Sequence, residues 1–374
     1  MVIWVIGRNY PLPDNAMQGS FELEQAKMLA HYGNEVHYLA CSLHPTKRIK
    51  GKGIQSWLDE GVKVTVNSEF FFPRIYPFYF VRGRNRHWKE LFEEVEKDGG
   101  LPDVIHIHYP AMLMIADALK EYHSKGVRVV ATEHWAKVLG KKLDSIEIKE
   151  FQKYGSVLDK MICVGSPLTK SVKELIGIDG EIVPNIVNDL FKPTNKPHNG
   201  FRFVAVGRLV KLKQFDKIIE AFCDCFLGQK DITLTIIGGG EEKDNLQKIV
   251  TAKQADDQVR LLGNQTREKT AEYVANSDSL ICYSTFETFG VPIIEAWACG
   301  LSTITSTTAA AVIDNFDDRL GVKVRPDDYE GLKKALTNVY AHREDYDKEF
   351  ISTYAKTHFS EIAVFNRLKQ LYEC

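Results

Sequence analysis

The chain has 374 residues, of which 44% are hydrophobic and 26% are charged, and its formal net charge is −2. This length suits two domains that each bury a core, and the composition argues against disorder as the main state. A nearly neutral chain has no long-range field that recruits nucleic acid, so any anion must be bound by local groups.

The first part of the chain alternates short apolar runs with amphipathic segments. Residues 21–32 and 111–123 are predicted to be helices, because their apolar side chains recur at helical spacing. Alternation of strands and helices is typical of a parallel sheet that carries helices on both faces. The predicted strands of this part are residues 2–6, 35–39, 62–66, 104–107 and 127–131.

The alternation stops at the sequence PNIVNDLFKPTNKPHNG, which is rich in Pro, Asn and Lys and breaks both periodicities. We therefore predict an α/β protein with two Rossmann-like domains in series. The first domain covers residues 1–184, a linker covers 185–200, and the second domain covers 201–344. Residues 345–374 are predicted to form helices that pack back on the first domain.

Alternation resumes after this linker. Two such α/β units in series place a cleft between them, with the carboxyl ends of the strands toward it. The predicted strands of the second domain are residues 201–206, 232–237, 259–262, 279–283 and 303–305.

The strongest local signal is the sequence STFETFGVPIIEAWACG, which follows the strand at 279–283. Gly290 permits a tight turn and Pro292 suits the first turn of a helix, whose free amides can donate to an anion. Glu287 lies in the turn and Glu295 in the helix, where carboxylates are suited to accept hydrogen bonds from sugar hydroxyls.

A second signal follows the first strand of the second domain, in the sequence AVGRLVKLK. Gly207 lets the chain turn, and Arg208 and Lys213 then lie near a strand end and a helix start. Arg with its forked donors and Lys as a point charge can together neutralise a diphosphate. The triple glycine Gly238–Gly240 in the next strand–helix turn is a weaker signal of the same kind.

Together these motifs resemble the nucleotide-sugar domain of glycosyltransferase family 4, whose members have the GT-B fold. The family pattern of two Glu separated by seven residues is met by Glu287 and Glu295. Its Gly-Arg-Leu with a following Lys is met by Gly207, Arg208 and Lys213. The resemblance covers nearly the whole chain and implies a retaining hexosyltransferase that uses a nucleoside-diphosphate sugar.

The resemblance also implies roles for single residues. Arg208 and Lys213 would hold the diphosphate, Glu287 the donor sugar and Glu295 the ribose, while His134 would face the sugar. The remaining residues implied to bind the donor are Gly19, Ser20, Gly207, Asn264, Phe289, Gly290, Val291 and Ile294.

Some positions depart from the family pattern. Gln214 stands where Gly is frequent, Ser302 stands where Pro is common, and Ala309-Ala310 replaces a pair of glycines. Because alanine adopts left-handed conformations less readily than glycine, we expect the Ala309-Ala310 loop to shape the donor pocket differently. The sequence does not define the base or the sugar of the donor.

No cofactor or metal is predicted. His106 and His108 share one face of a strand, but no third ligand is evident, and the seven cysteines lack zinc-site spacing. For His134 the alternative is a structural imidazole that bridges backbone groups.

The segment from Phe70 to Lys89 is dense in aromatic and basic residues and contains no acid. We hypothesise that it docks on an anionic membrane near a glycan or lipid-linked acceptor; the alternative is a set of core aromatics beside a solvated basic loop.

The first residues read as a strand and not as a secretory signal, and no run is long enough to span a bilayer. We therefore expect a cytoplasmic protein, peripheral on the inner membrane leaflet.

The resemblance places this activity in bacterial cell-surface polysaccharide synthesis. Two other functions stay open, namely a nucleotide-sugar isomerase or epimerase of the same fold, and a non-catalytic nucleotide-sugar-binding protein.

Overall fold

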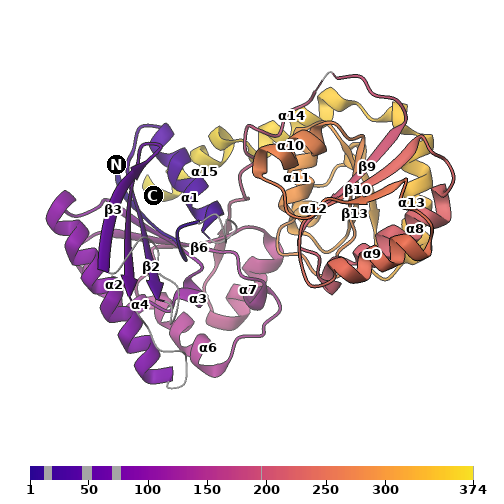
Figure 1. Ribbon diagram of the computed structural model, residues 1–374. Coiled ribbons are helices and arrows are strands. Elements are labelled where there is room, and N and C mark those ends of the chain that lie inside the picture. Colours follow the sequence, from indigo (N-terminus) through magenta and orange to yellow (C-terminus); the bar gives the residue numbers. More distant parts are fainter. Residues whose placement is uncertain (12–18, 44–52, 70–76, 195, 374) are drawn as a thin grey trace. The chain divides into compact units, whose positions relative to one another are not determined.

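A computed structural model describes residues 1–11, 19–43, 53–69, 77–194 and 196–373 (Figure 1). The chain divides into two compact units. Unit 1 comprises Met1–Val183 together with Phe365–Cys374, and unit 2 comprises Pro184–Val364. The residues from Phe70 to Tyr76 lie outside the described part, so the segment from Phe70 to Lys89 is described only from α2 onward.

Unit 1 is built on an eight-stranded sheet in the order β3-β4-β2-β1-β5-β6-β7-β8. All neighbouring strands are parallel except β3 and β4, which form an antiparallel pair at one edge. The inner strand β1 is apolar, and β5 is buried along its whole length although it carries His106 and His108, because both faces of a parallel sheet are covered. The strands are β1 (Val2–Ile6), β2 (Glu35–Leu43), β3 (Gly53–Asp59), β4 (Val62–Glu69), β5 (Val104–His108), β6 (Arg128–Glu133), β7 (Lys160–Cys163) and β8 (Gly180–Ile182).

The crossovers of unit 1 reverse direction after β4, so that α1 covers one face of the sheet and α2 and α4 cover the other. The helices are α1 (Ser20–His31), α2 (Pro77–Gly99), α3 (Pro110–Leu113), α4 (Ala116–Ser124), α5 (Ala136–Leu139), α6 (Ser145–Gln152) and α7 (Ser166–Ile176), with a short 3-10 helix, η1 (Lys153–Ser156). None of the helices in the described ranges is long and apolar enough to span a bilayer.

Unit 2 contains a six-stranded, fully parallel sheet in the order β11-β10-β9-β12-β13-β14. The direction of the crossovers changes between β9 and β12, the point at which ligands bind in open α/β sheets. The strands are β9 (Phe201–Val206), β10 (Ile232–Ile237), β11 (Val259–Leu261), β12 (Ser279–Cys282), β13 (Ser302–Ser306) and β14 (Gly321–Val324).

Helices surround the sheet of unit 2, and α11 is apolar except for Glu295 because it is buried between the sheet and α14. The α-helices of unit 2 are α8 (Phe215–Phe226), α9 (Lys243–Ala252), α10 (Arg267–Ala275), α11 (Val291–Ala298), α12 (Ala310–Asn315), α13 (Tyr329–Ala341) and α14 (Lys348–Phe359). The last helix, α15 (Glu361–Glu373), belongs to unit 1 from Phe365 onward. The 3-10 helices are η2 (Lys211–Lys213), η3 (Asp318–Leu320) and η4 (Arg343–Asp345).

The C-terminal helices divide between the two units, whereas the sequence predicted that all of residues 345–374 pack on the first domain. Helix α14 belongs to unit 2, where the Ser352 hydroxyl donates to the Ala298 carbonyl. The end of α15 clusters with unit 1 (Figure 1), because Phe365 stacks on Tyr32 with ring centroids 4.5 Å apart.

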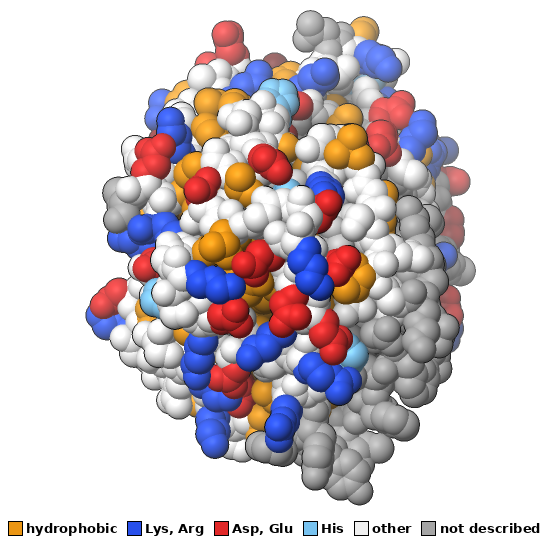
Figure 2. Space-filling model, turned by 90° about the vertical axis from the view of Figure 1, so that its left-hand side faces the viewer, with side chains coloured by type: hydrophobic (Ala, Val, Ile, Leu, Met, Phe, Trp, Pro, Cys, Tyr) orange, Lys and Arg blue, Asp and Glu red, His pale blue; other side chains and the backbone are white. Residues whose placement is uncertain are grey.

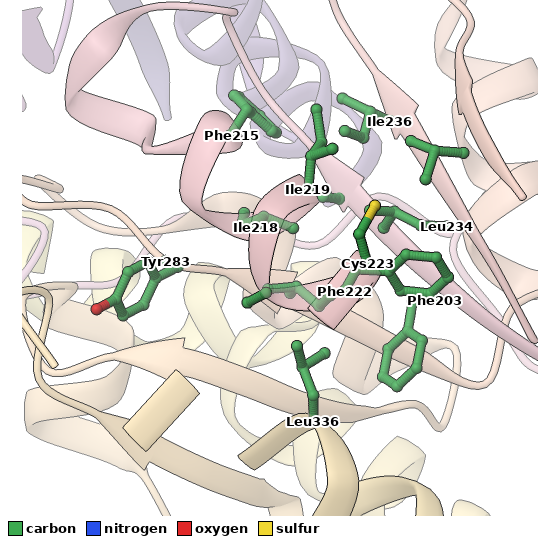
Figure 3. Close-up of a cluster of buried hydrophobic side chains, with 14 of the residues drawn as sticks. Phe203, Phe215, Ile218, Ile219, Phe222, Cys223, Leu234, Ile236, Tyr283 and Leu336 are labelled. Atoms are coloured by element: carbon green, nitrogen blue, oxygen red, sulfur yellow. The ribbon is translucent and has the colours of Figure 1, made fainter. Parts of the chain in front are cut away.

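The core of unit 2 is rich in aromatic residues that α8 contributes toward β9 and β10 (Figure 3). Phe222 is fully buried, and its ring centroid lies 6.2 Å from that of Phe203 and 5.7 Å from that of Phe226. Edge-on and tilted contacts of this kind add to the free energy gained by burying the rings. This core fixes α8 against the sheet and therefore positions the loop that precedes α8.

We predict that Phe222→Ala lowers the free energy of unfolding of unit 2 by about 3–5 kcal/mol, because it leaves a cavity that the neighbouring rings cannot fill. Hydrogen exchange of β9 and β10 amides, followed by mass spectrometry, measures the loss. Lys217→Ala on the same helix is the control and should change protection by no more than about 0.5 kcal/mol. Equal protection in the two variants would contradict this account of the core.

Candidate active site

The loops at the carboxyl edge of the unit 2 sheet are joined to one another by backbone hydrogen bonds. The Leu209 amide donates to the Gly239 carbonyl at 2.9 Å, and the Gly238 amide donates to the Gly263 carbonyl at 2.9 Å. The turns after β9, β10 and β11 therefore form one rigid surface, on which the predicted residue Gly207 lies.

Glycine is required where these loops approach each other. A Cβ atom on Gly238, whose φ is 141°, would lie 1.9 Å from the Gly207 carbonyl oxygen. A Cβ on Gly239 would lie 2.7 Å from Oδ1 of Asn264, another predicted donor-binding residue. The triple glycine, a weak signal in the sequence, thus brings the β10–α9 turn against Gly207 and Asn264.

Lys213 and Glu287 form an ion pair at this edge, although they are 74 positions apart in the sequence. A hydrogen bond of 2.8 Å from the Thr285 amide to the Leu212 carbonyl holds the two loops together. Both side chains are largely buried, with 22% and 15% of their surface exposed. Burial lowers the pKa of Lys213, but the charge of Glu287 outweighs it and the net pKa is raised, so the ammonium stays charged.

Arg208 lies on the same β9–α8 loop as Lys213, and its charge acts to lower the pKa of that lysine. Its side chain is exposed, in contrast to that of Lys213. The structure therefore brings three of the predicted residues, Arg208, Lys213 and Glu287, to one place. Two cations and one carboxylate leave an excess of positive charge for an anionic ligand.

Helix α11 begins beside Glu287 with an uncapped N-terminus. Gly290 precedes the helix with a φ of 95°, and no side chain caps it. A Cβ on Gly290 would lie 3.0 Å from the Cβ of Ala309 and 3.6 Å from Cγ of Glu287. Glycine thus keeps the chain close to both neighbours. Pro292 has no amide hydrogen and the Ile293 amide donates to the Gly290 carbonyl at 2.9 Å, so Val291 carries the amide at the helix start that can donate to a ligand.

The other predicted residues of α11 differ in exposure. Val291 is partly exposed, whereas the side chains of Phe289 and Ile294 are buried in the core. Phe289 packs edge-on against Phe359, with ring centroids 6.2 Å apart. Donor contacts of Phe289 and Ile294 stay predictions, which their buried side chains would leave to backbone atoms.

Glu295 forms an ion pair that the sequence analysis missed. Its Oε1 lies 3.0 Å from the guanidinium of Arg267, and only 5% of its side chain is exposed. Arg267 also lies over the ring of Phe191, 5.4 Å from the centroid. Arg at the first position of a helix opposes the helix dipole, which is the one signal in the sequence that points to a special role for Arg267.

The departures from the family pattern have simple structural explanations. Ala309 is extended, with a φ of −76°, and Ala310 opens α12, so the expected conflict with a left-handed backbone does not arise. Gln214 does adopt a left-handed conformation, with a φ of 50°, and its side-chain amide donates to the Pro326 carbonyl at 2.8 Å. That hydrogen bond offsets part of the strain that glycine would avoid.

In unit 1 the predicted glycine turn is tightly constrained. Gly19 has a φ of 89°, and a Cβ there would lie 2.0 Å from the Asn9 carbonyl oxygen. The same carbonyl accepts a 2.6 Å hydrogen bond from the Tyr38 hydroxyl. Ser20 is the first residue of α1, so both predicted residues lie at the N-terminus of that helix.

Arg8 is a second residue that the sequence analysis missed. Its Nε donates to a carboxylate oxygen of the buried Glu22 at 2.6 Å, and its guanidinium lies 3.7 Å from the ring centroid of Tyr109. Burial lowers the pKa of Arg8, but Glu22 more than offsets this effect and the net pKa is raised.

Three histidines form a stacked row along β5 and β6. The ring centroids of His106 and His108 are 4.6 Å apart, and those of His108 and His134 are 5.3 Å apart. The His106 ring is hydrogen-bonded at 2.6 Å to the hydroxyls of both Tyr372 and Thr132. Nδ1 of His108 and Nε2 of His134 are hydrogen-bonded at 3.0 Å.

All three rings are held neutral. Burial, and secondarily the neighbouring histidine, lowers the pKa values of His106 and His108 well below 6.5. Burial, followed by the charge of Arg8, lowers the pKa of His134 to about 3. No group of three His, Cys, Asp or Glu side chains that could hold a metal occurs among the residues with a described position.

Glu133 lies next to this row in a cradle of amides. Its carboxylate accepts hydrogen bonds from the amides of Trp135 at 2.8 Å, His134 at 2.9 Å and Ala111 at 3.2 Å. Burial nevertheless raises the pKa of Glu133 to about 7, because these amides only partly compensate the lost hydration. The cradle fixes the backbone of His134.

Two family models match adjoining halves of the chain. The model described as Glycosyltransferase Family 4 matches residues 20–189, and that described as Glycosyl transferases group 1 matches residues 187–357. Together they cover most of the sequence, in agreement with the resemblance seen in its motifs.

Curated relatives extend over much of the chain. The N-acetyl-alpha-D-glucosaminyl L-malate synthase of Bacillus anthracis is 24% identical over 306 residues, which cover 78% of this chain and 76% of the relative. The lipopolysaccharide core biosynthesis glycosyltransferase LpsD of Rhizobium meliloti is 25% identical over 284 residues, which cover 73% of this chain and 75% of the relative.

Solved structures confirm the predicted GT-B fold. Sucrose-phosphate synthase from Thermosynechococcus elongatus has a TM-score of 0.77 at 18% identity, over 100% of this chain and 98% of that chain. Anabaena HepE, in complex with UDP, has a TM-score of 0.72 at 14% identity, over 100% of this chain and 99% of that chain.

We predict that the free energy of unfolding of unit 1 decreases as the pH falls below about 6.5. The unfolded chain then binds protons that the three buried rings do not accept, and each ring contributes a slope of up to ~1.4 kcal/mol per pH unit. Glu133 acts in the opposite sense between about pH 7 and its ordinary value of 4.5, because the folded chain binds its proton first.

Urea unfolding at several pH values between 7.5 and 5, followed by tryptophan fluorescence, measures this slope. Four of the five tryptophans lie in unit 1, so the signal reports mainly on that unit. His108→Asn should reduce the slope by the contribution of one ring, while His31→Asn, at an exposed site on α1, serves as the control. Identical slopes for His108→Asn and the wild type would contradict the conclusion that the three stacked histidines are neutral.

Proposed function

Because the chain belongs to glycosyltransferase family 4, we propose that it transfers a hexosyl group from a nucleoside-diphosphate sugar to a glycan or lipid-linked acceptor, with retention of the anomeric configuration. The observation that carries the proposal is the pairing of Lys213 with Glu287 beside the start of α11, on a loop that also carries Arg208. A neighbouring fold in complex with UDP supports a nucleoside-diphosphate donor.

The charges of this site match the chemistry of the leaving group. As the glycosidic bond breaks, negative charge gathers on the diphosphate, and Arg208, Lys213 and the Val291 amide at the start of α11 stabilise it. Preorganised cations stabilise that charge without a metal ion, and we propose that the enzyme uses neither a metal nor a cofactor. Glu287 then accepts hydrogen bonds from the hydroxyls of the donor sugar.

Without a donor, Glu287 is the one ion-pair partner of Lys213 among the residues that the structure describes. A bound diphosphate competes for the ammonium and leaves the carboxylate available to the sugar. Glu295 holds the ribose in this proposal, and Arg267 pairs with its carboxylate when the donor is absent.

The unit 1 residues Gly19, Ser20 and His134 complete the proposed set. His134 is neutral, since its pKa is lowered to about 3, so it acts as a hydrogen-bonding imidazole and not as a cation. This protonation state suits a group that touches an uncharged sugar.

We further propose that the reaction contributes to the synthesis of bacterial surface polysaccharide, at the cytoplasmic face of a membrane. A relative that acts in lipopolysaccharide core biosynthesis supports this setting. The basic residues at the start of α2 support a contact with an anionic surface.

We predict that Arg208→Ala lowers the turnover of donor and acceptor by about 100-fold or more, because it removes a cation from the developing charge. A thermal-shift panel of nucleoside diphosphates and their sugars first identifies the donor, and release of the nucleoside diphosphate then measures turnover. Lys211→Ala is the matched control, since Lys211 is exposed on the same loop. Wild-type turnover in Arg208→Ala would remove Arg208 from the site, and donor conversion without acceptor would indicate an isomerase.

We also predict that Glu287→Gln separates binding from catalysis. Lys213 no longer has a carboxylate that competes with phosphate, so free nucleoside diphosphate should bind up to about tenfold more tightly, equivalent to ~1.4 kcal/mol. Turnover should nevertheless fall by about 100-fold, because the sugar loses its acceptor carboxylate.

Calorimetry with the nucleoside diphosphate and steady-state kinetics measure the two quantities separately. Glu241→Gln, an exposed acid in the neighbouring β10–α9 turn, is the control and should change neither. If Glu287→Gln bound the nucleoside diphosphate more weakly, the competition described here would be wrong.

A further inference from the structure

A groove of about 1140 Å³ opens on unit 1 between α2, α4 and α6. Its volume is at the upper limit of ordinary small-molecule sites, which measure about 300–1,000 Å³. None of the residues that line it belongs to the predicted catalytic or donor-binding set. Its lining contains five cations and two carboxylates.

One wall of the groove is a cationic stripe on α2. Arg82, Arg86 and Lys89 are spaced at i, i+4 and i+7, so they lie on the same side of the helix. All three side chains are exposed at the rim. The face shown in Figure 2 otherwise mixes Lys and Arg with Asp and Glu, so a stripe of one sign is not a general property of this surface.

The opposite wall is formed by α6 and the short helix η1 that continues it. Lys149 is exposed there, whereas Lys153 is partly buried and lies 2.7 Å from Asp117 and 2.8 Å from Glu150. Asp117 also pairs with Lys120 at 2.8 Å. Both carboxylates of the groove are thus already neutralised by lysines.

The charges of the other cations in the groove are little neutralised by carboxylates. Among the residues with described positions, no ion pair involves Arg82, Lys89 or Lys149, and Arg86 only approaches the exposed Glu90, at 3.5 Å. Like charges on facing walls repel each other, and an anion between them would remove that repulsion.

The floor of the groove does not compete for such an anion. Asn85 is buried, and its side-chain amide donates to the carbonyls of Val81 and Met114 at 3.0 Å, while its oxygen accepts from the Ala118 amide at 2.9 Å. Its hydrogen-bonding capacity is therefore used within the fold. Val81 and Ile146 add apolar surface that suits an organic group.

We propose that this groove binds a phosphate group attached to an organic molecule, and that this molecule is the sugar acceptor. A phosphate carries close to two negative charges at neutral pH and offers three acceptor oxygens, which suits several converging cations better than a single carboxylate does. Only the identification of the ligand as the acceptor rests on the proposed function. The phosphate is borne either by a membrane lipid or by a soluble molecule.

Two probes distinguish these sources: glycerol 3-phosphate, titrated by calorimetry, and phosphatidylcholine vesicles that contain phosphatidic acid, tested by co-sedimentation. Both experiments use the full chain with Arg208→Ala, so that the donor site contributes less to phosphate binding. We expect saturable binding to at least one probe, weakened when the salt concentration is raised. Binding to the vesicles alone assigns a lipid-borne phosphate, and binding to glycerol 3-phosphate alone assigns a soluble one.

The double variant Arg82→Glu/Lys149→Glu should weaken binding at least about tenfold, because it reverses one charge on each wall. Arg82→Gln/Lys149→Gln should have a smaller effect. The control Lys97→Glu/Lys142→Glu makes the same change in charge at exposed sites of unit 1 outside the groove and should stay within about twofold. Circular dichroism checks that each variant is folded.

Equal affinities for the groove and control variants, or no binding of either probe, would overturn the proposal. A separate assay keeps the proposed function distinct: with Arg208 intact, the groove variants should lose transfer to the acceptor but retain slow hydrolysis of the donor. Absence of donor hydrolysis from every variant and from the wild type, with phosphate binding intact, would count against the proposed function and not against the groove.

Discussion

The ion pair between Lys213 and Glu287 is the interaction on which the interpretation of unit 2 depends. It joins two loops that follow neighbouring strands β9 and β12, and both partners are mostly withdrawn from water. A pair of this kind is stable only while each charge retains the other or an equivalent substitute. A ligand that supplies an anion for the lysine and hydroxyl donors for the glutamate satisfies both at once, as a diphospho-sugar does.

Backbone geometry prepares this site before any ligand arrives. The triple glycine permits contact between the β9 and β10 turns, and Gly290 brings the start of α11 beside Glu287. The contact at Gly238 is rigid because it is made with the backbone of Gly207, whereas Gly290 packs against the side chains of Ala309 and Glu287. The same principle recurs in unit 1, where Gly19 contacts the Asn9 carbonyl. Such preorganisation favours electrostatic stabilisation of a developing charge, since the free-energy cost of orienting the dipoles is met during folding.

The sequence was sufficient to predict the alternating fold and the proximity of Arg208, Lys213 and Glu287, because strand ends in a parallel sheet meet at one edge. It was insufficient for Arg8 and Arg267, whose partners are chosen by tertiary packing and leave no local pattern. The antiparallel edge strand β3 was also missed, since its alternation of exposed and half-buried residues gives no apolar run. The Ala309-Ala310 loop was expected to shape the donor pocket differently because alanine disfavours the left-handed region, but Ala309 is extended and Ala310 is helical.

The division of the C-terminal helices has a practical consequence for dissecting the molecule. Unit 1 includes a C-terminal segment, Phe365–Cys374, that follows the whole of unit 2 in the sequence. In this segment Phe365 stacks on Tyr32, and the Tyr372 hydroxyl is hydrogen-bonded to the His106 ring. A stop codon after Val183 would therefore expose two aromatic docking surfaces and leave a buried histidine without its hydroxyl partner. To be produced separately, unit 1 needs its terminal segment supplied by a short artificial connection or as a second peptide.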